Sequence, residues 1–122
     1  MYKEIKIGKT MIPMIANAAT ALRYKNVFGK DLLAEFQNTG DDATKPMISI
    51  PELAFIMAKA AEAREGKADM NRLNEEIYLD WLEQFDPMDI PLAAEQIITL
   101  YAGDAMAEIE PKKNGKGKVK EN

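Results

Sequence analysis

The stretch that decides the fold is LRYKNVFGKDLLAEF, residues 22–36. Its pattern is typical of a helix that ends at a glycine and is followed by a second, short helix. Gly29 stands where a helix end favours a left-handed residue. Asp31 falls in the first turn of the next helix, where a negative charge suits the helix dipole. We therefore expect a helix over residues 18–28, with Asn17 as its N-cap, and a short helix after Gly29.

Apolar residues on both sides of Gly29 predict the faces that these two helices bury. The first helix carries one apolar stripe at helical spacing, in line with Lys25, and the second carries a compact apolar side. The stripe consists of Ala18, Ala21, Leu22 and Phe28, and the buried side of the short helix consists of Leu32, Leu33 and Phe36.

A β-hairpin is predicted before this stretch. Residues 3–7 alternate polar and apolar, and residues 10–14 follow after the pair Gly8-Lys9, which suits a two-residue turn. Pairing across that turn places Ile7 opposite Thr10. A lone hairpin is marginal in water, so its apolar face has to pack on the helices. That face consists of Ile5, Ile7, Ile12 and Met14.

Three longer helices are predicted after the loop over residues 38–46. Ser49-Ile50-Pro51-Glu52 fits a capping box for a helix that runs to about residue 65. A second helix covers residues 72–85 and ends at Asp86-Pro87, because the residue before proline resists helical angles. A third begins near Asp89 or Pro91 and ends by Gly103. The expected inward residues are Leu53, Ile56, Met57, Ala60 and Ala61, then Leu73, Ile77, Trp81 and Leu82, and finally Ala94, Ile97, Ile98 and Tyr101.

The predicted fold is therefore mainly α, with an N-terminal β-hairpin packed on a bundle of four to five short helices. We expect a single domain over residues 1–110, since 122 residues are enough for one domain. Residues 111–122 contain five Lys and one apolar side chain, which predicts a disordered basic tail. No apolar run approaches the roughly 20 residues that span a bilayer, so a soluble intracellular protein is expected.

Composition argues against catalysis and against metal or cofactor binding. Cys and His are absent and Ser49 is the only serine, so no familiar nucleophilic triad and no thiolate or imidazole metal site can form. The paired carboxylates at residues 41–42 and 75–76 are expected in a loop and on a helix surface, rather than in a cleft. Gly8-Lys9-Thr10 is similar to the end of a phosphate loop but lacks the upstream glycine. We expect no enzyme activity and no cofactor.

Two features are typical of a surface that binds another protein. The chain has eight Met, which suit adaptable apolar surfaces but also fill gaps in cores. The helix over residues 72–85 has a broad apolar stripe, which indicates either an exposed patch or burial on two sides. The candidate partner-binding residues, chosen by side-chain type, are Phe55, Met57, Tyr78, Trp81, Phe85 and Tyr101.

In combination these features resemble the tail assembly chaperones of long-tailed, siphovirus-type bacteriophages and of prophages in Gram-positive hosts. The resemblance is carried by IKIGK at residues 5–9, by LRYK at 22–25 with FGKDLL at 28–33, and by IEPKK at 109–113. An aromatic-rich helix over residues 75–85 and a later helix that reaches Tyr101 complete the pattern. The resemblance extends in order over nearly the whole chain.

The resemblance implies a chaperone of the host cytoplasm that binds the tape measure protein and keeps it soluble until the tail tube assembles. Such chaperones are not part of the mature virion. Many have a longer form, made by programmed ribosomal frameshift, whose extra segment recruits the tail tube protein. If this chain has such a longer form, we expect the codons of residues 112–114 to form a slippery run at which the ribosome shifts frame. Assembly into a homo-oligomer is left open.

The alternative is a small phage or host regulatory protein that binds nucleic acid or another protein. The net charge of the whole chain is −4, and residues 1–110 alone carry −8. Such a body repels phosphate, so only the lysine tail can attract nucleic acid. Retention on DNA at physiological salt would favour this alternative. We expect neither membrane nor nucleic-acid binding.

Overall fold

The computed structural model describes residues 1–37 and 45–109 of the chain. Within these ranges an antiparallel hairpin, β1 (Tyr2–Ile7) and β2 (Thr10–Ile15), comes first. The helices that follow are α1 (Thr20–Phe28), α2 (Leu32–Gln37), α3 (Lys45–Arg64), the short 3₁₀ turn η1 (Met70–Arg72), α4 (Glu75–Leu82) and α5 (Asp89–Ile109). The predicted fold class, a hairpin packed on a bundle of helices, is confirmed.

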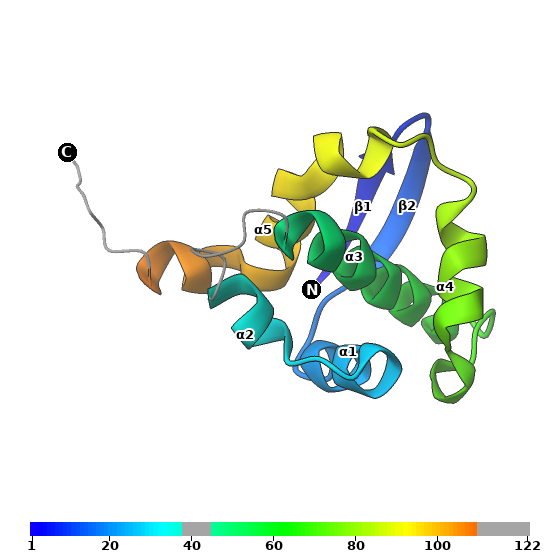
Figure 1. The fold of residues 1–122 in the computed structure, drawn as a ribbon, viewed down its shortest axis with the longest axis horizontal. Coiled ribbons are helices and arrows are strands. Elements are labelled where there is room, and N and C mark those ends of the chain that lie inside the picture. The colour runs from blue at the N-terminus through cyan, green and yellow to red at the C-terminus, as the bar shows by residue number, and fades with distance from the viewer. Residues whose placement is uncertain (38–44, 110–122) are drawn as a thin grey trace.

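Helix α3 is the centre of the arrangement. In Figure 1 it crosses the middle of the molecule past the hairpin, with α1 and α2 below it and α4 at the right. Strand β2 packs on α3, β1 packs on α5, and α3 and α5 also contact each other. The hairpin therefore fills the angle between these two helices and supplies the apolar face that both of them cover.

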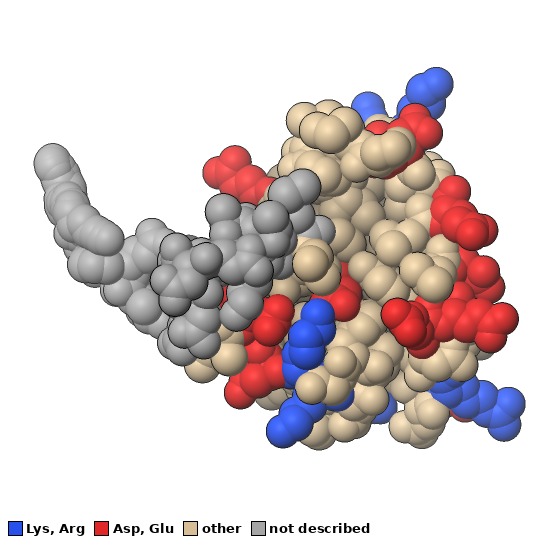
Figure 2. Space-filling model, in the orientation of Figure 1, with Lys and Arg blue, Asp and Glu red and all other residues tan. Residues whose placement is uncertain are grey.

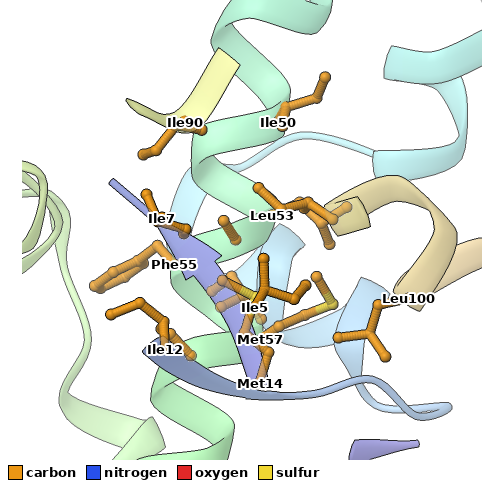
Figure 3. Packing of buried hydrophobic residues seen from close by; sticks show 14 of the residues in the cluster. Ile5, Ile7, Ile12, Met14, Ile50, Leu53, Phe55, Met57, Ile90 and Leu100 are labelled. Atoms are coloured by element: carbon orange, nitrogen blue, oxygen red, sulfur yellow. The ribbon is translucent and has the colours of Figure 1, made fainter. Parts of the chain in front are cut away.

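The hairpin has the predicted register. Ile7 pairs with Thr10 and Ile5 with Ile12, and the four predicted apolar side chains are all buried. Figure 3 shows them facing residues of α3 and α5, among them Leu53, Met57 and Leu100. The alternation of polar and apolar residues decides which face is buried, and the two-residue turn decides the pairing.

The hairpin turn also sits against the start of α5. Gly8 has a φ of 65°, and a Cβ at this position would lie 2.5 Å from Oδ2 of Asp89. That carboxylate accepts a hydrogen bond of 2.9 Å from the backbone N–H of Asp86. The turn, the connection after α4 and the start of α5 therefore meet at one place.

Helix α1 begins later and buries a different face than predicted. The backbone N–H of Ala19 donates to the Asn17 side chain at 2.9 Å, which makes a turn before the helix, and α1 begins at Thr20. Tyr24 is fully buried, whereas Leu22 is 60% exposed. Ala21 and Phe28 of the predicted stripe do pack against the core, but Leu22 does not, so the buried face is rotated from the predicted one toward Tyr24. Gly29 ends α1 with a φ of 71°, as predicted.

Helix α2 is short and is capped by the residue that was predicted to lie in its first turn. The Asp31 carboxylate accepts hydrogen bonds from the backbone N–H groups of Leu33 and Ala34, at 3.0 and 3.3 Å. Leu32 is buried as predicted, but Leu33 is 57% exposed, so its predicted burial is wrong. A six-residue helix that packs along one side can bury only part of so broad an apolar run.

The predicted capping box at residues 49–52 is wrong, because α3 already begins at Lys45. Ser49 is fully buried inside this helix, and its Oγ donates to Oε1 of Glu35 at 2.9 Å. Glu52 is also turned toward other helices. Pro51 lies inside α3, where it removes one backbone donor from the helix. Partners from α1 and α2 thus replace the local hydrogen bonds that a capping box would make.

The helix predicted over residues 72–85 is shorter than expected at both ends. Residues 70–72 form η1, and α4 begins after Asn74, whose side chain accepts a 2.9 Å hydrogen bond from the backbone N–H of Ile77. It ends at Leu82, so that Phe85 lies in the connection to α5. A side-chain N-cap of this kind fixes where the helix starts, even though Leu73, before the cap, continues the apolar spacing.

Helix α5 begins at Asp89, as predicted, and continues to Ile109. Its backbone is non-helical at Gly103, with φ 55° and ψ −145°, so the predicted break appears as a kink. The buried face is Ile90, Ala93, Ile97 and Leu100, whereas Ala94, Ile98 and Tyr101 are half-buried. The inward stripe is therefore rotated by one residue from the prediction. The predicted loop over residues 38–46 is wrong at its end, because residues 45 and 46 already belong to α3. The rest of that loop and the predicted tail over 111–122 lie outside the described residues.

Candidate functional site

The six predicted partner-binding residues do not form one exposed surface. Phe55 and Met57 are fully buried, and Tyr78 and Trp81 are nearly so. Phe85 and Tyr101 are half-buried. Side chains with no exposed surface cannot touch a partner in this conformation, so the fold accounts for Phe55 and Met57 as core residues. Partner binding by the set stays a prediction.

Most of these aromatic residues belong to one buried aromatic cluster, made of Tyr24, Phe28, Phe55, Tyr78, Trp81 and Phe85. Its ring centroids are 5.0 Å apart for Phe28 and Tyr78, 5.1 Å for Phe55 and Tyr78, and 5.6 Å for Phe55 and Trp81. Phe85 closes the series at 5.0 Å from Trp81. Edge-to-face contacts at such distances stabilise a core. The cluster joins α1, α3 and α4.

An open groove lies at the edge of this cluster, between α3, α4 and the start of α5. Its volume is about 580 Å³, within the range of ligand sites, roughly 300–1,000 Å³. We call it the α3–α4–α5 groove. It is lined by Ile48, Pro51, Glu52, Glu75, Tyr78, Leu82, Phe85, Asp86, Pro87, Ile90 and Pro91. Two of the six predicted residues, Tyr78 and Phe85, thus reach this groove, whereas Trp81 and Tyr101 do not line it.

The floor of the groove is apolar, and apolar side chains around it reach solvent. Of the residues that line it, Leu82 and Phe85 are half-buried and Ile90 is buried. Ile48 is 54% exposed at one wall. Met88 and Leu92, beside the prolines of the opposite wall, are also exposed. Apolar groups that meet at an open hollow are typical of a binding site for another molecule.

One wall of the groove rests on a buried polar network. The Tyr24 hydroxyl donates to Oε1 of Glu52 at 2.7 Å, and Nζ of Lys30 lies 2.9 Å from the same oxygen. Burial and this carboxylate raise the pKa of Tyr24 above its ordinary value. Because Glu52 has both partners, its charge is compensated, and the network fixes α1 and the α1–α2 connection against α3.

Tyr78 differs from Tyr24 although both hydroxyls lie near Glu52. Tyr78 is 8% exposed and lines the groove. Burial raises its pKa, and the Glu52 charge raises it further. Among the described residues, no hydrogen bond joins its hydroxyl to a partner. A buried phenol that can both donate and accept therefore stands at the groove without a partner in this part of the chain.

The groove lies in the most acidic part of the chain. Residues 73–103 contain seven Asp and Glu and no Lys or Arg. Four of these acids belong to α4 and the residue that follows it, Glu75, Glu76, Asp80 and Glu83. In Figure 2 acidic side chains gather along the edge of the molecule where Figure 1 places α4. Within 1–36 and 48–103, neither Glu75 nor Asp86, which both line the groove, makes an ion pair.

A second, smaller hollow of about 230 Å³ lies between the hairpin turn and the connection after α4. Asp86 and Asp89 line it together with residues 7–10. Asp89 already accepts the hydrogen bond of the Asp86 backbone, which gives it a structural role. In the ranges that the structure describes, no group of three or more Asp and Glu could hold a metal ion.

Sequence reasoning missed most of the groove. Its walls come from residues 48–52, 75–82 and 85–91, which tertiary packing alone brings together. One local signal was available, since three prolines at 51, 87 and 91 interrupt otherwise apolar segments and mark the walls. Across the described residues no helix is long and apolar enough to cross a membrane.

Comparisons of the chain with known protein families, with curated proteins and with solved structures found no match.

Proposed function

We propose that the protein is a tail assembly chaperone of a long-tailed bacteriophage or prophage, which binds the tape measure protein and keeps it soluble until the tail tube assembles. The proposal is supported by the resemblance of residues 5–9, 22–33 and 109–113 to that family. On this proposal the protein acts by binding, without catalysis, in the host cytoplasm. It is absent from the finished particle.

The observation that carries the proposal is the open apolar α3–α4–α5 groove. A tape measure protein is a long, helical chain with apolar stripes, and an amphipathic helix is held by laying such a stripe into an apolar groove. Ile48 and Phe85 offer apolar contact at the groove. Many copies bound weakly along one long chain would together keep it soluble through multivalency.

The test is co-expression of the full chain with a helical fragment of the tape measure protein encoded in the same genome. We expect the fragment to move from the insoluble to the soluble fraction and to co-purify with the chain. An unchanged solubility and no complex would refute the chaperone function. The order of neighbouring genes is a second check, with a tail tube gene upstream and a very long tape measure gene downstream expected.

A further inference from the structure

We propose that the α3–α4–α5 groove selects a partner helix whose apolar stripe is flanked by lysine or arginine side chains, which pair with Glu75, Asp86 and the Tyr78 hydroxyl. This inference deepens the proposed function and rests on it, because it names the chemistry of the helix that the groove holds. Three independent observations carry it: the apolar floor, the rim carboxylates that make no ion pair with a described residue, and the phenol that makes no hydrogen bond with one.

The apolar floor selects a stripe rather than a flexible polar segment. Leu82, Phe85 and Ile90 present carbon to the groove, and the prolines of its walls have no backbone N–H to donate. An extended peptide that binds through main-chain hydrogen bonds finds few donors on such walls. A helix satisfies its own backbone, so its apolar side chains can enter the groove without unpaired polar groups.

The carboxylates at the rim of the groove favour a partner helix with positively charged side chains on either side of its apolar stripe. Glu75 and Asp86 are exposed, line the groove and make no ion pair with any residue that the structure describes. Glu52 is compensated by Lys30, so the free negative charge lies at the rim and not in the floor. With no Lys or Arg in residues 73–103, the local field attracts cationic side chains and repels nucleic acid and acidic helices.

The Tyr78 hydroxyl adds a specific polar contact. Its ring packs against Phe28 and Phe55, with centroids 5.0 and 5.1 Å away, so the position of the ring is fixed by the core. Burying a hydroxyl without a hydrogen bond is unfavourable. A donor from the partner, such as a lysine ammonium at the groove, would satisfy it.

Three designed helical peptides test the proposal in titrations of the full chain at physiological salt. The first carries a leucine stripe at helical spacing flanked by lysines, the second has glutamates in place of these lysines, and the third keeps the lysines but has serines in place of the leucines. We expect the first to bind at least about tenfold more tightly than either of the others. Equal binding of the first two would overturn the charge selection, and equal binding of the first and third would overturn the apolar selection.

Charge-reversal variants locate the contact. Glu75→Lys with Asp86→Lys should weaken binding of the first peptide about tenfold or more. The matched control is Glu76→Lys with Glu83→Lys, which changes the net charge equally, likewise at one residue of α4 and one residue after it, but alters exposed residues that do not line the groove. Binding by the control should stay within about threefold of the parent chain. Equal losses in both variants would overturn the assignment to the groove.

Two tyrosine-to-phenylalanine variants test the role of the Tyr78 hydroxyl. Tyr78→Phe should weaken binding of the first peptide about three- to tenfold, the effect of one lost hydrogen bond, while the thermal midpoint does not fall. Tyr101→Phe removes a hydroxyl that does not line the groove and should leave the affinity unchanged. An unchanged affinity of Tyr78→Phe would overturn the role of this hydroxyl.

Other occupants of the groove would show themselves in the same titrations. If the chain's own lysine tail filled it, replacing the five tail lysines by glutamine would tighten binding of the first peptide more than tenfold. If a second copy filled it, affinity would fall as protein concentration rises. Either result would overturn the proposal. If a tape measure fragment binds and the first peptide does not, the proposed charge selection is wrong but the chaperone function stands. If the first peptide binds and the fragment does not, only the chaperone function is refuted.

Discussion

The hydrogen bond between Tyr24 and Glu52 should stabilise the fold measurably, and Tyr24→Phe removes it together with the weaker interaction of the same hydroxyl with Ser49. The ring stays in place, so no large cavity forms. The variant loses a buried hydrogen bond of 2.7 Å to a carboxylate, an interaction worth about 1.5–3 kcal/mol. Lys30 still lies 2.9 Å from the same carboxylate and limits the penalty. We therefore expect a loss of about 2 kcal/mol in the free energy of unfolding.

Urea unfolding followed by the fluorescence of Trp81 measures this loss. The indole is the only one in the chain and lies in the buried aromatic cluster, so it reports loss of that packing. For a chain of this size the midpoint should fall by about 1 M urea, from typical m-values of about 1–3 kcal/mol/M. The m-value itself should not change.

Tyr78→Phe is the matched control. It makes the same chemical change in the same aromatic cluster, but its hydroxyl has no hydrogen-bond partner among the described residues. Its stability should be unchanged or higher by up to about 1 kcal/mol, because a buried unpaired hydroxyl is removed. Equal losses for the two variants, or a Tyr24→Phe variant as stable as the parent chain, would refute the role given to the Tyr24–Glu52 pair.

The remaining predictions concern the turn, the core and alkaline pH. Gly8→Ala should lower the free energy of unfolding by at least about 1 kcal/mol more than Gly29→Ala does. Both positions have positive φ, but only a Cβ at Gly8 meets a carboxylate, at 2.5 Å. Urea midpoints measure both losses, and equal losses would contradict this prediction. Met57→Ala should lower the free energy of unfolding by about 2–5 kcal/mol, because this side chain is fully buried in the core. If Met57 served only to contact a partner, the same substitution would leave the stability almost unchanged in urea unfolding. Stability should fall above about pH 10, because burial raises the folded-state pKa of Tyr24 and Tyr78 above the unfolded value. Below that pH their contribution is complete, and urea midpoints from pH 8 to 12 should show a shallower alkaline loss for Tyr24→Phe.

The hairpin could be predicted in detail because its signals are local. Alternation along residues 3–7 and 10–14 decides the buried face, and the pair Gly8-Lys9 decides the register. The stop at Gly29 was predictable for the same reason, since a left-handed residue after a helix has few alternatives to glycine.

The features that could not be predicted depend on partners far away in the sequence. Ser49 and Glu52 have the spacing of a capping box, yet Glu35, Tyr24 and Lys30 take their polar groups instead. Phe55 lies off the main apolar stripe, but α3 is central and buries that side as well. The spacing of apolar residues along a helix identifies one buried face, but it cannot reveal that a second face is also covered.

The candidate site shows the same limit. Aromatic side-chain type pointed to Phe55 and Trp81, which the fold places in its core, whereas the groove is made by Leu82, Ile90 and three prolines together with Tyr78 and Phe85. Large apolar side chains serve both the core and binding surfaces, so their type alone cannot separate the two roles.

The most direct test of the groove as the partner site compares two helix-surface variants by calorimetric titration of a tape measure fragment into the full chain. Ile48→Glu changes an apolar side chain that lines the groove and is 54% exposed, and Leu22→Glu changes one on α1 that does not line it and is 60% exposed. Both should fold, because neither side chain is buried. We predict that Ile48→Glu weakens binding about tenfold or more, since a charge enters the apolar wall, while Leu22→Glu binds as the parent chain does. Equal affinities for the two variants would contradict the assignment of partner binding to this groove.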